Sequence, residues 1–351
     1  MNYPEKLSEA WKDHLAPKAK DALTVVSLFA GCGGSSLGYS MAGFRECLTV
    51  EWDKHACETF RANFPDVPIY EGDIGALTDA DALRLAGLQP GQLDVLDGSP
   101  PCQGFSTVGL RAQSDGRNRL FEQYVRLLRA FKPRAFVMEN VTGLVKGGMG
   151  QVFAEIHRAL TGCGYRVKAR VLNASWYGVP QSRERVIFVG IREDLEVESE
   201  HPKPETRAVT VRDALVDVEL ASDTPMLSTS YAAICARLKQ GKDAKTVTPM
   251  HNWSTKRVAN DKPSFTLLKT NMGHGAGTLL HPTENRTLSI PEAKRIQSFP
   301  DAFQILGEFT EAWARIGNSV PPLLMRAIAR QVADTLSRSQ GIDAGLGALE
   351  A

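Results

Sequence analysis

The chain has 351 residues, 43% hydrophobic and 23% charged, with a formal net charge of +1, which excludes a disordered chain and a strongly basic or acidic protein. Its six cysteines show neither Cys-x-x-Cys nor Cys/His spacing, which argues against a metal site and a disulfide framework. Because no secretory leader or long apolar run occurs, we expect no membrane span and a cytoplasmic location with reduced thiols.

Apolar, β-branched runs alternate with helical patterns through the first 190 residues. The expected buried strands are residues 24–29, 47–52, 67–73, 93–99, 135–141 and 185–190. Segments of helical periodicity, such as 53–64 and 119–131, lie between them. This alternation predicts an α/β fold with a doubly wound, mostly parallel sheet.

The periodicity weakens from about residue 191 to 285, where Pro, Thr, Ser and Gly are frequent, and helical patterns return at 290–299 and 321–336. We therefore expect a second, smaller, loop-rich domain. The predicted division is an N-terminal extension (1–22), a catalytic and cofactor-binding domain (23–195), the smaller domain (196–285), a return to the first domain (286–338) and a C-terminal tail (339–351).

The sequence FAGCGGSSLG follows the first expected strand. Gly31 and Gly33 allow a tight turn and a close approach of the backbone to a ligand at a helix N-terminus. Glu51, twenty residues after Gly31, ends the second strand, where a carboxylate can bind ribose hydroxyls. Ser36 stands where the last glycine of a GxGxxG motif would be. The pattern favours a cofactor that contains a nucleoside, but the missing glycine argues against NAD. A purely structural glycine turn is the alternative.

Two further side chains follow expected strands near this turn. Trp52 can stack on an adenine or belong to the core. Asp73 can reach an adenine amino group or cap the next helix.

The sequence DGSPPCQGFS contains Cys102 directly behind two prolines, which stiffen the chain after the fourth strand. Glu139 ends the fifth strand, so the two residues can face one pocket at the carboxyl edge of the sheet. A thiolate is a strong nucleophile and a carboxyl group can carry a proton. Arg183 and Arg185 enter the sixth strand and can bind a carbonyl oxygen or a phosphate. The structural alternatives are a buried thiol for Cys102, a helix cap for Glu139, and a salt-bridged strand edge for the two arginines.

The order of eight motifs resembles that of DNA (cytosine-5) methyltransferases. The blocks are SLFAGCGGSSLGYSMAGF, EWDKHACETFRANFP, GDI, GSPPCQGFS, ENV, QSRERVIFVG, RTLSIPEAKRIQSFP and GNSVPPLLMRAIAR, within residues 24–190 and 285–335. The resemblance implies an enzyme of the S-adenosylmethionine-dependent methyltransferase fold. The chain is similar to bacterial or phage members.

The resemblance also implies roles for single residues. Cys102 matches the nucleophile that adds to carbon 6 of cytosine, Glu139 the residue that engages ring nitrogen 3 and the amino group, and Arg185, with Arg183, the holder of the ring oxygen. The target base has to be flipped out of the duplex. The cofactor is S-adenosyl-L-methionine, and the positions that match its pocket are Phe29, Ala30, Gly31, Gly33, Glu51, Trp52, Asp73, Ile74, Pro100, Leu120, Asn318 and Ser319.

Two basic stretches suit a polyanion, and with the resemblance they favour duplex DNA as the partner; solvated surface charge without a partner is the alternative interpretation of the charge alone. Residues 234–300 contain eleven Lys or Arg and four Asp or Glu, and residues 103–134, which match the mobile catalytic loop of the family, contain seven and two. The loop-rich segment matches the target recognition domain, where Arg, Lys, Asn and Gln read base edges. We expect a monomer, either in a restriction-modification system with a separate endonuclease or acting alone. A tRNA cytosine-5 methyltransferase and a catalytically silent DNA-binding protein are the alternatives.

Overall fold

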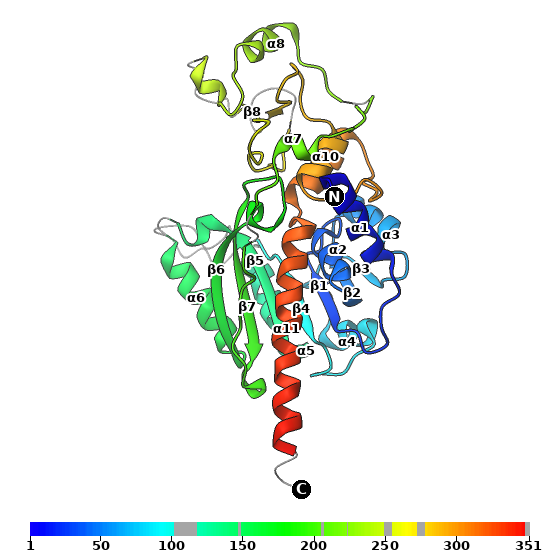
Figure 1. Ribbon diagram of the computed structural model, residues 1–351. Helices are drawn as coiled ribbons and strands as arrows, with labels where there is room; N and C mark the ends of the chain where they lie inside the picture. The colour runs from blue at the N-terminus through cyan, green and yellow to red at the C-terminus, as the bar shows by residue number, and fades with distance from the viewer. Residues whose placement is uncertain are drawn as a thin grey trace.

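The computed structural model describes residues 1–101, 118–146, 149–204, 207–222, 224–248, 255–271 and 278–347. Its main feature is a seven-stranded sheet in the order β3-β2-β1-β4-β5-β7-β6 (Figure 1). The strands are β1 (Thr24–Leu28), β2 (Arg45–Glu51), β3 (Ile69–Glu71), β4 (Val95–Gly98), β5 (Ala135–Val141), β6 (Tyr165–Asn173) and β7 (Glu184–Arg192).

The first five strands in the chain run parallel, whereas β7 is antiparallel to both β5 and β6. The expected mostly parallel α/β sheet is therefore confirmed. The edge strand β6 was missing from the sequence prediction. Its side chains are largely half-buried or exposed, so it lacks the continuous apolar run that marks the inner strands.

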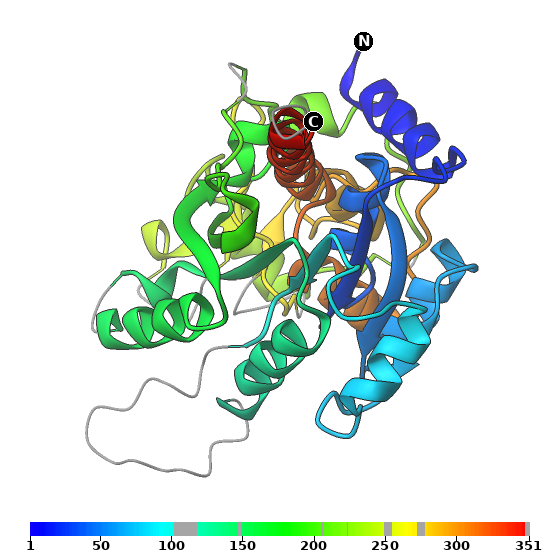
Figure 2. The ribbon, with the colours of Figure 1, turned by 90° about the horizontal axis from the view of Figure 1, so that it is seen from below.

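Helices cover both faces of the sheet (Figure 2). The helices of this body are α1 (Tyr3–Leu15), α2 (Gly34–Met41), α3 (Lys54–Asn63), α4 (Asp79–Ala86), α5 (Asn118–Phe131), α6 (Gly150–Thr161) and α11 (Pro322–Gly347). Successive strand residues serve opposite faces, as the two-residue period of a strand requires. Val25 packs in the apolar cluster that contains residues of α1, α2 and α11, and Val26 packs in the cluster with α4, α5 and α6.

Helices α2 and α11 cross in close contact although they lie almost 300 residues apart in the chain. A Cβ atom at Gly38 would lie 2.6 Å from the Cβ atom of Met325 and 2.7 Å from the carbonyl oxygen of Pro322. Only glycine allows this approach. Helix α11 starts with a proline and continues to Gly347, past the expected domain end at 338.

A smaller lobe lies at one end of the molecule (Figure 1). It contains α8 (Thr229–Ala236) and the short strands β8 (Lys256–Arg257) and β9 (Leu279–Leu280), and it meets the body through α7 (Val211–Ala214), α9 (Ile290–Ile296) and α10 (Phe309–Asn318). Two apolar clusters, smaller than those of the body, pack these elements.

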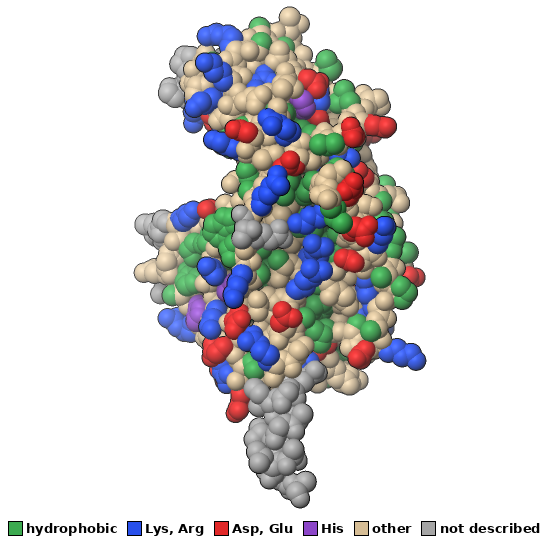
Figure 3. Space-filling model, viewed as in Figure 1, with side chains coloured by type: hydrophobic (Ala, Val, Ile, Leu, Met, Phe, Trp, Pro, Cys, Tyr) green, Lys and Arg blue, Asp and Glu red, His purple; other side chains and the backbone are tan. Residues whose placement is uncertain are grey.

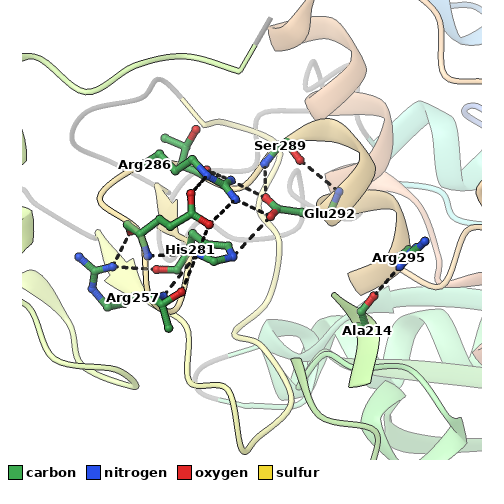
Figure 4. A network of polar contacts seen from close by, with 10 residues as sticks. Ala214, Arg257, His281, Arg286, Ser289, Glu292 and Arg295 are labelled. Atoms are coloured by element: carbon green, nitrogen blue, oxygen red, sulfur yellow. Dashed lines mark hydrogen bonds and ion pairs between the residues drawn. The ribbon is translucent and has the colours of Figure 1, made fainter. Parts of the chain in front are cut away.

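A polar network crosses this lobe (Figure 4). Arg286 forms two hydrogen bonds of 2.8 Å with the carboxylate of Glu292 on α9 and pairs with Glu284 at 2.8 Å. Ser289 caps α9, and its backbone N–H donates to Glu292 at 2.7 Å. Arg257, only 5% exposed, donates to backbone carbonyls of the lobe. Buried charge is tolerated here because each guanidinium has several acceptors.

No helix among the described residues has the length and apolar character needed to cross a membrane.

Candidate active site

The glycine turn lies at the carboxyl end of β1 and leads into α2. Phe29, Gly31 and Gly33 have φ angles of 56°, 57° and 95°, in the left-handed region that favours glycine. A Cβ atom at Gly33 would lie 2.7 Å from the ring of Phe64. The turn is thus pressed against α3, and its backbone faces the carboxyl edge of the sheet, as Ala30 donates to the carbonyl of Val50 in β2.

Glu51 holds this turn in place. One carboxylate oxygen accepts a hydrogen bond of 2.7 Å from the N–H of Gly31, and the other accepts 2.9 Å bonds from Trp52 and Asp53. The side chain is 8% exposed. A carboxylate oxygen can accept two hydrogen bonds, so the oxygen bound to Gly31 keeps capacity for a ligand hydroxyl.

Trp52 and Asp73 flank the turn on neighbouring strand ends. Trp52 is 79% exposed, so the core alternative is wrong and its ring face is open to stacking. Asp73 accepts a 2.8 Å hydrogen bond from the N–H of Gly75, whereas Thr78 caps α4. Asp73 therefore does not cap the next helix, and it is exposed, while Ile74 beside it is buried.

The C-terminal block returns to the same turn. The hydroxyl of Ser319 lies 3.1 Å from the Cys32 sulfur, and a Cβ atom at Gly34 would lie 2.5 Å from the carbonyl oxygen of Val320. Ser319 is buried and Asn318 is exposed. The fold thus brings Phe29, Ala30, Gly31, Gly33, Glu51, Trp52, Asp73, Ile74 and Ser319 to one edge of the sheet.

Arg315, which the sequence analysis missed, reinforces this junction. It pairs with Asp53 at 2.5 Å, directly after Trp52, and its carbonyl accepts the Ser319 hydroxyl at 2.7 Å. The residue lies only three positions before the expected Asn318. Its partner Asp53 lies far away in sequence, so no local pattern indicates the pair.

Cys102 and residues 103–117 lie outside the described residues. The chain up to this point is held by Asn140, whose side-chain amide donates to the carbonyl of Pro100 at 2.9 Å. Gly98 pairs with Met138, so Glu139 lies next to the end of β4. The chain that leads into Cys102 therefore leaves the sheet beside Glu139, and Asn140, a second residue missed from the sequence, positions it.

The second part of the basic stretch 103–134 forms a helix rather than a loop. Residues from Asn118 onward form α5, which packs Tyr124 and Leu128 into the core and holds Leu120 half-buried against it. Arg126 donates to the carbonyls of Ile74 and Leu77 at 3.1 and 2.8 Å. The prediction of a mobile loop through 134 is therefore wrong for 118–131, which form α5 and in which the basic side chain of Arg126 has a structural role.

Glu139 and Arg185 form a buried ion pair at the end of the β5–β7 ladder. The Arg185 Nε atom lies 2.6 Å from the Glu139 Oε1 atom, and the side chains are 15% and 11% exposed. The antiparallel register pairs Arg185 with Val141, two residues beyond Glu139. Arg185 borders a polar cleft of about 260 Å³, which is lined by Thr142, Asn173, Ser182, Glu184, Arg185 and Thr266. Such a charge pair offers an acceptor and several donors to one small ligand.

Arg183 lies behind this pair and is 2% exposed. It donates to the carbonyl of Leu267 at 3.0 Å, and its Nε atom has no partner among the described residues. Burial lowers the pKa of the Arg183 guanidinium to about 9, assisted by repulsion from Arg185 and opposed by Glu139. A buried donor without a partner calls for an explanation, and a bound ligand is one such explanation.

The basic excess of the smaller lobe divides into surface and interior charges. Figure 3 shows Lys and Arg side chains on the lobe above the notch that separates it from the body. The exposed ones include Arg237, Lys239, Lys242, Lys245, Lys262 and Lys269. Arg257, Arg286 and Arg295 are 5%, 8% and 6% exposed. These three belong to internal contacts, so the count from sequence overstates the charge available to a polyanion.

Comparison with solved structures agrees with this architecture. A prophage-encoded E. coli protein superposes with a TM-score of 0.75 at 25% identity, covering 90% of this chain and all of the other. The Dnmt2 methyltransferase of S. pombe gives a TM-score of 0.64 at 19% identity, covering 91% and 99%, and shows a shared fold.

The chain belongs to the C-5 cytosine-specific DNA methylases, whose family model matches residues 23–334. It is 36% identical to the Type II methyltransferase M1.HphI of Haemophilus parahaemolyticus, over 89% of this chain and 87% of the relative. It is 31% identical to M.NgoPII of Neisseria gonorrhoeae, over 92% and 99%. The expected DNA (cytosine-5) methyltransferase is confirmed, and neither the tRNA enzyme nor the silent binding protein is favoured.

Proposed function

We propose that this enzyme transfers a methyl group from S-adenosyl-L-methionine to carbon 5 of a cytosine flipped out of a short, specific duplex DNA sequence. The observation that supports this best is the buried Glu139–Arg185 pair beside the chain that leads into Cys102. Family membership supports cytosine in DNA as the substrate.

The target pocket has the groups that cytosine requires. In this proposal Glu139 engages ring nitrogen 3 and the amino group, and Arg185, with Arg183 behind it, holds the ring oxygen. Withdrawal of electrons toward nitrogen 3 makes carbon 6 electrophilic, so the Cys102 thiolate can add there. Carbon 5 then becomes a nucleophile and accepts the methyl group. Loss of the carbon 5 proton to a base and departure of the thiolate restore the aromatic ring.

The groups at the glycine turn fit a nucleoside cofactor. The open ring of Trp52 can stack on an adenine, the free acceptor capacity of Glu51 can take a ribose hydroxyl, and the N-terminus of α2 lies at the turn. When bound, S-adenosylmethionine supplies an electrophilic methyl group. The wider pocket of the proposal includes Asp73, Ile74, Pro100, Leu120, Asn318 and Ser319.

The test is base-resolution methylation sequencing of DNA from a methylation-free host that expresses the intact chain, Cys102→Ala or Glu139→Gln. We expect carbon 5 methylation at one short motif with the intact chain only, and a loss of rate on the order of 100-fold or more for each variant. Lys168→Met, which removes an exposed pair with Glu198 on the outer strand β6, is the control that should keep full activity. Full methylation by Cys102→Ala would contradict the covalent mechanism.

We further propose that residues 196–285 select the target sequence, because most exposed basic side chains of the smaller lobe lie there. Exchange of this segment with that of a relative of different specificity should transfer the methylated motif. An unchanged motif would place recognition elsewhere.

The names of the relatives support a place in a Type II restriction-modification system. We propose that the enzyme acts as a cytoplasmic monomer, without a stable complex with its endonuclease. Sedimentation at increasing concentration should give the mass of one chain, and a dimer would contradict this.

A further inference from the structure

Two buried glutamines lie between the two proposed pockets. Gln181 precedes the arginine pair, and Gln297 ends α9, and both are 0% exposed. Neither residue has a role that is predicted from the sequence. A buried amide has two N–H donors and a carbonyl acceptor that need hydrogen-bond partners. The partners of these two amides therefore show which parts of the protein they connect.

The amides form one continuous chain of hydrogen bonds. The N–H of Leu267 donates to Gln181 Oε1 at 2.9 Å, Gln181 Nε2 donates to Gln297 Oε1 at 2.5 Å, and Gln297 Nε2 donates to the carbonyl of Ser319 at 2.6 Å. The backbone donor at one end and the backbone acceptor at the other fix the orientation of both amides. Aligned hydrogen bonds strengthen one another in a dry interior.

Each end of this chain belongs to a proposed pocket. The carbonyl of Leu267 accepts a hydrogen bond from Arg183, and the N–H of the same residue donates to Gln181. The backbone of Leu267 therefore connects Gln181 to the target pocket. Ser319 contacts Cys32 in the glycine turn, at the cofactor pocket. The chain thus joins four segments that are distant in sequence.

We propose that Gln181 and Gln297 are positioning residues that fix the distance between the target pocket and the cofactor pocket. The proposal rests on the assignment of the two pockets made above. Methyl transfer needs the donor and carbon 5 within a near-attack distance, and a misplacement of about 1 Å can cost on the order of 100-fold in rate. A rigid polar link across the gap supplies that precision better than apolar packing, because it specifies direction as well as distance.

The sharpest variants replace an amide with a carboxyl group of the same shape. In Gln297→Glu the acceptor for Gln181 remains, but an oxygen faces the carbonyl of Ser319, so the contact is restored only when the carboxyl is protonated. Gln181→Glu places the same conflict against Gln297 Oε1 and against the carbonyl of Ile296, to which Gln181 Nε2 also donates at 3.4 Å, away from Ser319. A matched control is Asn63→Asp, since the buried Asn63 amide donates to the carbonyls of Thr59 and Gln304 at 2.8 Å.

The experiment measures melting temperature, kcat and the KM for S-adenosylmethionine of the full chain on duplex DNA at pH 6 and pH 8.5. We expect Gln181→Glu, which does not touch the cofactor block, to raise this KM and lower kcat about 10-fold at pH 8.5, with recovery toward pH 6. The double variant should show less than the product of the single effects. Asn63→Asp should lower the melting temperature without changing either constant.

Unchanged constants in both glutamine variants, with a melting temperature lowered as in Asn63→Asp, would overturn the proposal and leave a structural role only. Should the acidic variants fail to fold, Gln297→Met provides the same comparison without a charge. Glu139→Gln is assayed in parallel: full activity in that variant would refute the target-pocket assignment, and with it this inference.

Discussion

The sheet body and the smaller lobe are stabilised in different ways. In the body, the strands and their helices share two large apolar clusters, and consecutive residues of β5 and β7 alternate between them. In the lobe, each strand has two residues, and one buried guanidinium donates to four carbonyls, those of Cys235, Leu238, His281 and Glu284, at 2.7–2.8 Å.

The two kinds of packing suit different functions. In the body, the apolar core accepts exchange of similar side chains but keeps the sheet that positions the pockets. Point contacts between one arginine and loop carbonyls leave the outer loop surface free to vary. A lobe built in this way can carry different surface residues on the same internal support, which suits a segment proposed to read DNA sequence.

The largest expected effect comes from removing the central support of the lobe. Arg257→Met leaves four carbonyls and the Asn285 side chain without their donor, and each unsatisfied buried group costs about 1–3 kcal/mol. We expect hydrogen exchange in 228–286 to rise and DNA affinity to fall, while the body keeps its protection and its cofactor affinity. Lys242→Met, at an exposed site of the same lobe, should leave hydrogen exchange in both the lobe and the body unchanged. An equal rise in hydrogen exchange in the body would show that Arg257 does not support the lobe alone.

A smaller effect is expected from Glu46 in the body, a half-buried residue whose Oε2 atom is enclosed. Burial raises the pKa of the Glu46 carboxyl from 4.5 to about 7, opposed by hydrogen bonds from serine and threonine hydroxyls, and its Oε2 atom has no partner among the described residues. A folded-state pKa above the unfolded value means that its contribution to stability is fully present below pH 4.5 and is lost as the pH rises through 7.

Glu46→Gln should therefore raise the free energy of unfolding by on the order of 2 kcal/mol at pH 8 and by little at pH 4.5. Denaturant unfolding at both pH values measures this. Gln151→Glu, which places a carboxyl group on an exposed position of α6, serves as the control without a buried charge. A gain of equal size at both pH values would show that the ionisation of Glu46 is not the cause.

The smallest effect concerns the junction of the two regions. Ser289 accepts a hydrogen bond of 3.4 Å from the N–H of Glu292 as the N-cap of α9. Ser289→Ala should cost about 1 kcal/mol of stability. Because Glu292 still pairs with Arg286, we expect the lobe and the body to unfold together in a single denaturant transition. Separate transitions in this variant would show that the cap, rather than the ion pair, joins the regions.

The same difference decides what could be predicted from sequence. The inner strands and the glycine turn have local signatures, apolar runs and left-handed positions, and the structure contains them. Strand β6 has no such run and was missed. Gln181, Gln297, Arg315 and Asn140 act through partners that are distant in sequence or on the backbone, so their residue types alone give no signal.

The basic charges of the lobe illustrate the limit of composition. Arg257 and Lys256 are neighbours of equal charge, yet one is buried in carbonyl contacts and the other lies over the ring of Phe265 at 4.8 Å. A count of charges assigns both to the surface. Only the three-dimensional partners separate a residue that supports the lobe from one that can reach a phosphate.

The contact between the glycine turn and the C-terminal block has a consequence for biosynthesis. Gly34 packs against Ser319 and Val320, and Gly38 packs against α11. The N-terminal two thirds of the protein leave the ribosome before these partners exist. We expect a nascent chain or a truncated product that ends before residue 319 to lack a completed cofactor pocket, so methylation activity begins only when synthesis is nearly finished.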